Sequence, residues 1–135
     1  MKSRISRCHN PALIAQLDSM IFPKDDPVEF KGSEWWITSV EGVAVAFASI
    51  KLRGEAAFLT RAGVLKEYRG HGLQSKLIAA RVKYALAMGI GVVATYTLVC
   101  NPASSNNLIA QGFKAYAPAY AWVGRDVIYW QRGME

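Results

Sequence analysis

The middle of the chain reads Val64-Leu65-Lys66-Glu67-Tyr68-Arg69-Gly70-His71-Gly72-Leu73-Gln74-Ser75. This segment joins an apolar run to a stretch with helical periodicity through a turn that contains two glycines. Glycine lets the backbone approach a ligand closely, and the unpaired N–H groups at the start of a helix attract phosphate groups. The segment therefore predicts an anion site at residues 70–75, although glycines in this place can also serve only to close a strand-to-helix connection.

A long amphipathic helix is predicted directly after this turn, ending near Gly89. Its apolar residues recur three to four positions apart and comprise Leu73, Leu77, Ala80, Tyr84 and Met88, with Ile78, Val82 and Ala85 beside them. We interpret Lys76, Arg81 and Lys83 as its solvated face rather than as a nucleic-acid patch. A buried strand at residues 91–98 and a short helix from residue 102 or 103 to about 111 follow.

Antiparallel strands are predicted before the turn. Residues 35–39 and 43–48 are β-branched and aromatic runs joined by Glu41-Gly42, which predicts a hairpin, and residues 57–64 add a third strand. Asn10 and Pro11 open a short helix at residues 11–19, preceded by a strand. Residues 22–27 are expected to form a loop, with a helical turn at 28–31 as an option. Residues 113–122 and 126–132 predict a last hairpin around Val123-Gly124-Arg125.

Length and composition narrow the class of protein. The 135 residues suit one domain, and 52% hydrophobic against 19% charged residues exclude a disordered chain. No apolar run approaches the length of a membrane span and no signal peptide is visible, so we expect a cytoplasmic protein without a membrane partner.

Cys8 and Cys100 match no metal or redox spacing, which predicts free thiols and no metal site. The net charge of +6 favours an anionic partner, either a phosphate-bearing ligand or a nucleic acid.

Two motifs together resemble one known family. Arg69-Gly70-His71-Gly72-Leu73-Gln74 resembles the Arg/Gln-x-x-Gly-x-Gly/Ala signature of the GNAT superfamily of N-acetyltransferases, and Asn101-Pro102-Ala103-Ser104 through Gly112-Phe113 is similar to its asparagine-led helix. The resemblance covers nearly the whole chain. It implies a single α/β (α+β) domain over residues 1–135, with a mixed, mostly antiparallel sheet flanked by helices and splayed between the fourth and fifth strands. It also implies acetyl-CoA as co-substrate.

The resemblance implies a binding site in the splay. The backbone of Ala62, Gly63 and Val64 would pair with the pantetheine arm, and Asn101 would touch the same arm while capping the next helix. The residues expected at the pyrophosphate are Arg69, Gly70, His71, Gly72, Leu73, Gln74 and Ser75. Gln74 stands where the signature has Gly or Ala, and we expect its longer side chain to point away from the ligand.

The usual acid and base of the family are missing. Leu108 stands at the position of the tyrosine acid, and Tyr96 stands where some members carry a glutamate base. A free amine can attack the thioester directly if the enzyme positions it and polarises the carbonyl. We predict Tyr96 as a catalytic residue, with core packing as its alternative, and Ser104 as a residue that orients a water. Tyr116 and Tyr120 are further candidates for proton removal, although we expect them to pack in the last hairpin, and we expect Cys100 to be a spectator.

The first functional hypothesis is therefore acetyl transfer to a primary amine, whose identity the motifs leave open. The alternatives are a non-catalytic GNAT-like module that holds CoA or a protein, and a nucleic-acid-binding protein suggested only by the basic charge. Residues 21–36 and the last hairpin are expected to select the acceptor. Aromatic side chains exposed on that hairpin would favour a homodimer.

Overall fold

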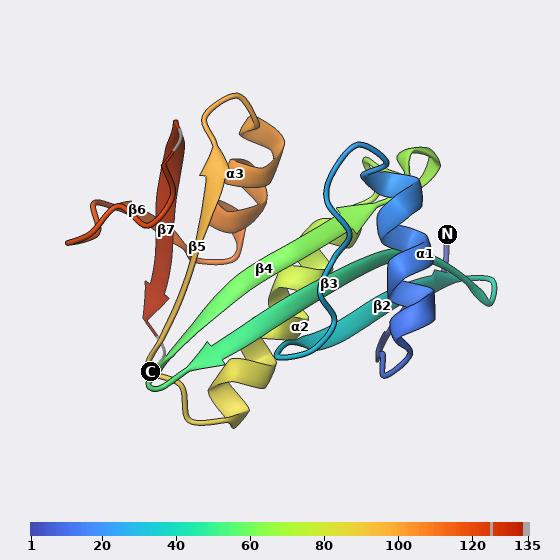
Figure 1. The fold of residues 1–135 in the computed structure, drawn as a ribbon, viewed down its shortest axis with the longest axis horizontal. Coiled ribbons are helices and arrows are strands. Elements are labelled where there is room, and N and C mark those ends of the chain that lie inside the picture. Colours follow the sequence, from blue (N-terminus) through green and yellow to red (C-terminus); the bar gives the residue numbers. More distant parts are fainter. Residues whose placement is uncertain (125, 134–135) are drawn as a thin grey trace.

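The computed structural model describes residues 1–124 and 126–133. Within this part of the chain, seven strands form one sheet in the order β1-β2-β3-β4-β5-β7-β6 (Figure 1). The strands are β1 (Ser3–Arg7), β2 (Glu34–Val40), β3 (Val43–Arg53), β4 (Ala56–Val64), β5 (Val92–Leu98), β6 (Lys114–Tyr116) and β7 (Val127–Gly133). Neighbouring strands are antiparallel except for β4 and β5, which confirms the predicted mixed, mostly antiparallel sheet.

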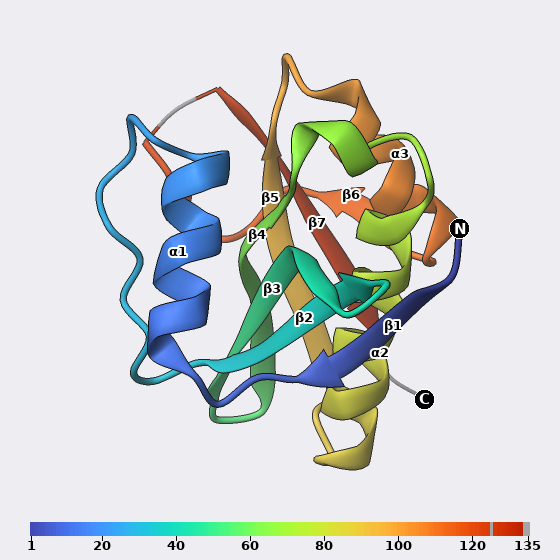
Figure 2. The same cartoon turned by 90° about the vertical axis from the view of Figure 1, so that its right-hand side faces the viewer.

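Helices cover both faces of the sheet. They are α1 (Pro11–Ile21), α2 (Leu73–Ala87) and α3 (Pro102–Ala110), with a short 3-10 helix, η1 (Lys66–Tyr68), before α2. Figure 2 shows α1 on one face and α2 and α3 on the other. The larger core lies between the sheet and α2, and a second core under α1 contains Ile14, Leu17, Trp35 and Phe47.

The first half of the fold follows the predicted elements. Asn10 caps α1, because its side-chain oxygen accepts hydrogen bonds from the N–H groups of Ala12 and Leu13 at 3.1 and 3.3 Å. The helix then continues to Ile21, two residues beyond the predicted end. Glu41 and Gly42 both have positive φ, 52° and 79°, as a two-residue type I′ hairpin turn requires. The optional helical turn at residues 28–31 does not form.

The predicted splay between the fourth and fifth strands is confirmed. In the described part of the chain β5 pairs with β4 only over Val92–Ala94, opposite Ala56–Phe58. The Thr95 hydroxyl still donates to the Leu59 carbonyl at 3.0 Å, and from there the two strands separate. The gap opens toward the carboxyl ends of both strands, next to the start of α2.

A β-bulge in β4 explains where the strands part. The register between β3 and β4 shifts between Ala48 and Ile50, so that β4 carries an extra residue near Thr60 and Arg61. A bulge bends its strand and increases its local twist. The Ser49 hydroxyl supports this one, at 2.7 Å from the Thr60 hydroxyl oxygen and 3.0 Å from the Arg61 carbonyl oxygen.

Helix α2 follows the predicted apolar pattern with one correction. Lys76 and Lys83 are exposed as expected, but Arg81 is only 2% exposed, so its assignment to the solvated face is wrong. Arg81 Nε donates to the Leu77 carbonyl at 3.2 Å, and its NH1 donates to the Ser49 carbonyl at 2.9 Å. Burial lowers the pKa of Arg81 to about 9, so the guanidinium is still charged at neutral pH. Met88 lies beyond the helix end and is exposed.

The last hairpin is shorter than predicted. Its first strand covers only Lys114–Tyr116 rather than residues 113–122, and Pro118, which has no N–H to donate to a ladder, comes shortly after it. The loop that follows is fastened to β7, because the Tyr129 hydroxyl accepts from the Val123 N–H at 2.9 Å and donates to the Val123 carbonyl at 3.2 Å. Arg125, from the predicted turn, lies outside the described residues.

Candidate active site

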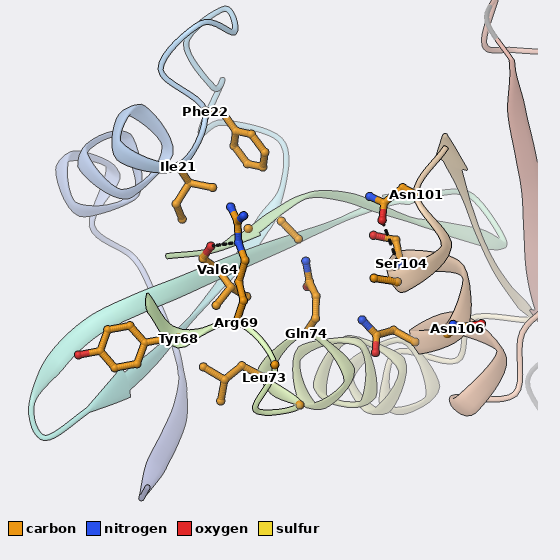
Figure 3. A pocket seen from close by; sticks show the side chains of 16 residues that line it. Ile21, Phe22, Val64, Tyr68, Arg69, Leu73, Gln74, Asn101, Ser104 and Asn106 are labelled. Carbon is orange, nitrogen blue, oxygen red and sulfur yellow. Dashed lines mark hydrogen bonds between the residues drawn. The ribbon is translucent and has the colours of Figure 1, made fainter. Parts of the chain in front are cut away.

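A cavity of about 650 Å³ lies at the open end of the gap between β4 and β5, between the end of β4 and the start of α3. Its walls come from the end of α1, the end of β4, the glycine turn with the first residues of α2, and the start of α3 (Figure 3). Of the residues predicted from the sequence, those that line it are Ala62, Gly63, Val64, Arg69, Gly70, Gly72, Leu73, Gln74, Asn101 and Ser104. The structure adds lining residues that were not predicted for the donor site, namely Ile21, Phe22, Tyr68, Ala103, Asn106 and Asn107.

The glycine turn presents bare backbone to this cavity. Gly70 and Gly72 have φ of 82° and 76°, a left-handed conformation that favours glycine, and a Cβ on either would meet no atom within 4 Å. The first N–H in α2 with a partner inside the helix is that of Lys76, which donates to the Gly72 carbonyl at 3.2 Å. Helix geometry leaves the N–H groups of residues 73–75 unpaired at the positive end of the helix dipole. This turn and helix start fit a pyrophosphate.

Arg69 adds a positive charge beside this turn. Its Nε donates to the Val64 carbonyl at 3.1 Å, which holds the side chain across the end of β4. Figure 3 shows the rest of the guanidinium extending toward Ile21 and Phe22 at the cavity wall. The side chain is exposed, so the guanidinium can still pair with a phosphate.

Three predicted residues at the helix start behave differently from their neighbours. Gln74 lines the cavity and its side chain points into it (Figure 3), so the expectation that it turns away is wrong. Its Oε1 atom is buried and has no hydrogen-bond partner among the described residues. The Ser75 hydroxyl accepts a hydrogen bond from Gln111 Nε2 at 2.8 Å, tying α2 to α3. Ser75 and the exposed His71 lie outside the cavity lining.

The edge of β4 forms the opposite wall. Residues 62–64 pair with residues 46–48 of β3 on one side, and their other side faces the gap. Gly63 sits where α1 crosses this strand: a Cβ there would lie 2.8 Å from both Ile21 Cγ2 and Phe22 Cε2. Only glycine therefore allows the end of α1 to lie this close to the cavity.

Gly63→Ala is accordingly expected to lower the free energy of unfolding by about 1–3 kcal/mol, the usual cost of overpacking. Urea denaturation would measure the change. Gly91→Ala is the matched control, because a Cβ at Gly91 would make only an ordinary 3.7 Å contact with the Glu55 carbonyl oxygen. A Gly63→Ala protein as stable as the Gly91→Ala protein would show that α1 is not packed as described.

A second cavity, of about 760 Å³, lies over β3, β4 and β5. It shares Phe22, Ala62, Asn101 and Ser104 with the first, so the two cavities meet at the start of α3. Tyr96 lines the second cavity and is 44% exposed, which excludes the alternative that it only packs in the core. The Trp122 ring lies edge-on to Tyr96, with 5.6 Å between ring centroids.

Asn101 and Ser104 stand where the cavities join. The Asn101 side-chain oxygen accepts from the Ser104 N–H at 3.2 Å, so the expected capping role is present. Figure 3 shows both side chains pointing toward the first cavity. Among the described residues, no Asp, Glu or His lines either cavity, and Leu108 is buried in the core, 4% exposed. The hydroxyls of Tyr96 and Ser104 remain as candidates to accept a proton.

The other residues weighed from the sequence line neither cavity. Tyr116 packs against Tyr129, as expected, whereas Tyr120 is 77% exposed and does not pack. Cys100 is exposed and Cys8 is buried, both as free thiols. Within the described residues no cluster of His, Cys, Asp or Glu could hold a metal ion, and no helix is both long and apolar enough to cross a membrane.

Known structures share this fold. One is the ribosomal-protein-S18-alanine N-acetyltransferase from Escherichia coli, with a TM-score of 0.80 and 16% identity over 98% of this chain and 94% of that one. Another is a Bacillus subtilis acetyltransferase in complex with CoA, with a TM-score of 0.81 and 14% identity over 99% and 100%. A third is yncA from Salmonella typhimurium with its cofactor acetyl-CoA, with a TM-score of 0.77 and 18% identity over 98% and 94%.

The sequence itself gives a family match. No curated protein matches the chain significantly. The family model described as the acetyltransferase (GNAT) family, however, matches residues 7–113 and so includes α1, the glycine turn, α2 and α3. The chain therefore belongs to the acetyltransferase (GNAT) family, as the resemblance of its two motifs had predicted.

Proposed function

We propose that this protein transfers the acetyl group of acetyl-CoA to a primary amine, by direct attack in a ternary complex. The observation that carries the proposal is the meeting of two cavities at Ala62, Asn101 and Ser104. One cavity has a backbone cradle suited to a pyrophosphate, and the other gives an acceptor a separate way to the same point. The related folds solved with CoA and with acetyl-CoA support the choice of donor.

The first cavity would hold the donor. Its pyrophosphate would lie against the N–H groups of residues 70–75, where His71 and Ser75 contribute through their backbone, and beside the Arg69 guanidinium. The pantetheine arm would follow residues 62–64, and the Asn101 side chain would contact it from the other wall. The donor supplies an activated thioester, and these residues would hold that group at the junction of the cavities.

The chain would contribute mainly positioning and proton removal. Holding amine and thioester together in a cavity replaces a bimolecular encounter and can lower the barrier substantially. The amine must also lose a proton, and Tyr96 and Ser104 would accept it, directly or through a water, because they offer hydroxyls on the acceptor side of the junction.

Cys8 and Cys100 are free thiols, which fits the reducing cytoplasm that we propose as the location of this protein.

Tyr96→Phe is expected to lower kcat about 100-fold, the lower range for loss of a general base, while KM for acetyl-CoA stays unchanged. Tyr116→Phe, which alters a tyrosine that packs on Tyr129 outside both cavities, is the control. Equal kcat values for the Tyr96→Phe protein and the wild type would remove Tyr96 from the mechanism.

The proposed reaction is tested by incubating the protein with acetyl-CoA and a panel of primary amines. Release of the CoA thiol should accompany formation of an acetylated amine, detected by mass spectrometry, in equal amounts. Binding of acetyl-CoA without acetylation of any amine would contradict the proposal and would favour a non-catalytic CoA-binding module.

A further inference from the structure

The second cavity is positively charged. Lys51 and Arg53 from β3 and Arg61 from the bulge of β4 all line it, whereas none of its described lining residues is acidic. A protonated amine without a compensating group would be repelled from such a cavity, and an anionic group would be attracted. The cavity that the acceptor would enter thus carries a charge that selects among amines.

Two of the three cations are available to a ligand. Arg61 is already paired, with its Nε 2.8 Å from Asp18 Oδ1 and its NH1 3.4 Å from Asp25 Oδ2, and it stacks 4.5 Å above the Phe22 ring. By contrast, no described carboxylate lies within 4.0 Å of the side-chain nitrogen atoms of Lys51 or Arg53. Lys51 and Arg53 are therefore the cations that can pair with an anion.

The sheet register places these cations at one end of the cavity. Lys51 pairs with Phe58 and Arg53 pairs with Ala56, at the end of β4 where β5 is still attached. The junction with the first cavity lies at Ala62, four residues beyond Phe58 and six beyond Ala56, which is about 13 and about 20 Å on a strand that rises about 3.3 Å per residue. An acceptor that reaches from the junction to these cations must therefore be elongated.

An aromatic wall lies between the two ends. The Trp122 ring lies edge-on to Phe58 and Tyr96, with centroid separations of 5.5 and 5.6 Å, and all three residues line the cavity. Figure 1 shows α1 in front of the β2–β4 part of the sheet and away from β5, which leaves this side of the splay uncovered by a helix. An apolar chain would contact this wall.

We propose that the acceptor is an elongated amine with an anionic group at its far end: the amine reaches Ala62 and Ser104, an apolar middle lies on the aromatic wall, and a carboxylate pairs with Lys51 and Arg53. This proposal rests on the proposed acetyl transfer and names the substrate class of the same site. It selects against amines that have no anionic group and against amino acids whose carboxylate is next to the amine.

Three probes separate these features. ε-Aminocaproate has the amine, the apolar chain and the carboxylate; ε-aminocaproamide lacks only the charge; and free glycine lacks the chain. We expect kcat/KM for ε-aminocaproate to exceed that of either other amine by about tenfold or more, the value of a charge-assisted hydrogen bond. Lys51→Gln should raise KM for ε-aminocaproate by about the same factor and Arg53→Gln by less, because Arg53 lies further from the junction, with kcat and the kinetics of ε-aminocaproamide little changed.

The controls are Lys76→Gln and Lys83→Gln, which remove the same charge from exposed positions of α2, on the other side of the sheet. Equal kcat/KM for ε-aminocaproate and ε-aminocaproamide, or equal effects of the control variants, would overturn this inference while leaving acetyl transfer intact. Acetyl-CoA binding, measured separately by calorimetry, reports on the proposed function alone.

If no amine turns over, ε-aminocaproate is titrated into the protein saturated with CoA. Binding that Lys51→Gln weakens supports the anion site, and absent or unselective binding overturns it.

Discussion

Gly72→Glu is expected to weaken acetyl-CoA binding by about 100-fold or more, because bringing like charges together costs several kcal/mol and each 1.4 kcal/mol is about tenfold in affinity. The space beside Gly72 is open, with no atom within 4 Å of a Cβ, so the glutamate side chain would occupy the place proposed for the pyrophosphate. Gly70→Glu should act in the same way for the same reason. Calorimetric titration with acetyl-CoA measures both effects.

The chain offers a matched control at the other end of the same helix. Gly89 follows α2, has a φ of 74° against 76° for Gly72, and also has no atom within 4 Å of a Cβ. Gly89→Glu therefore introduces the same charge and about the same backbone strain far from the cavity. Wild-type affinity in the Gly72→Glu protein, or an equal loss in the Gly89→Glu protein, would show that the glycine turn does not bind the donor.

Arg81→Ala is expected to lower the free energy of unfolding by about 3 kcal/mol, from a cavity in the core and from a buried acceptor left without a donor. Arg81 is the donor to the Ser49 carbonyl, and the Ser49 hydroxyl in turn holds the bulge at Thr60 and Arg61. The substitution should thus loosen the point where β4 leaves β5, as well as the packing of α2. Urea denaturation and hydrogen exchange at the bulge measure these two effects.

Lys83→Ala is the comparison for this variant. Lys83 lies two residues along the same helix and is exposed, so its replacement should change the free energy of unfolding by no more than about 0.5 kcal/mol. Arg81→Met separates the two causes, since it fills most of the space but donates no hydrogen bond. If the Arg81→Ala protein were as stable as the Lys83→Ala protein, the buried guanidinium would not support the bulge.

Residues that act through local sequence could be predicted. Asn10 with Pro11, Glu41 with Gly42 and Gly70 with Gly72 each fix a cap or a turn within a few residues, and the corresponding helix starts and hairpin lie where expected. The order of the elements follows from these positions. Their local chemistry is strong enough to set both the type of each element and at least one of its ends.

Features that depend on contacts between distant segments could not be predicted in the same way. The site of the splay depends on a bulge held by Ser49, a residue with no motif around it. Arg81 was assigned to solvent by its residue type, although it lies in the row Leu73, Leu77, Arg81 and Ala85, spaced four residues apart on the buried face. That row is the signal that would have found it. The second cavity, with Lys51 and Trp122, exists only because the β3–β4–β5 face and the loop before β7 meet in space.

The most direct test of the account is to map the amide chemical shifts of the isotope-labelled protein as acetyl-CoA is added. We expect the largest changes on residues 62–64 and 70–75 and on Asn101, with none at the Glu41-Gly42 turn on the far hairpin. Changes that avoid residues 70–75, or no saturable change at any amide, would contradict the claim that the gap between β4 and β5 holds the acetyl donor.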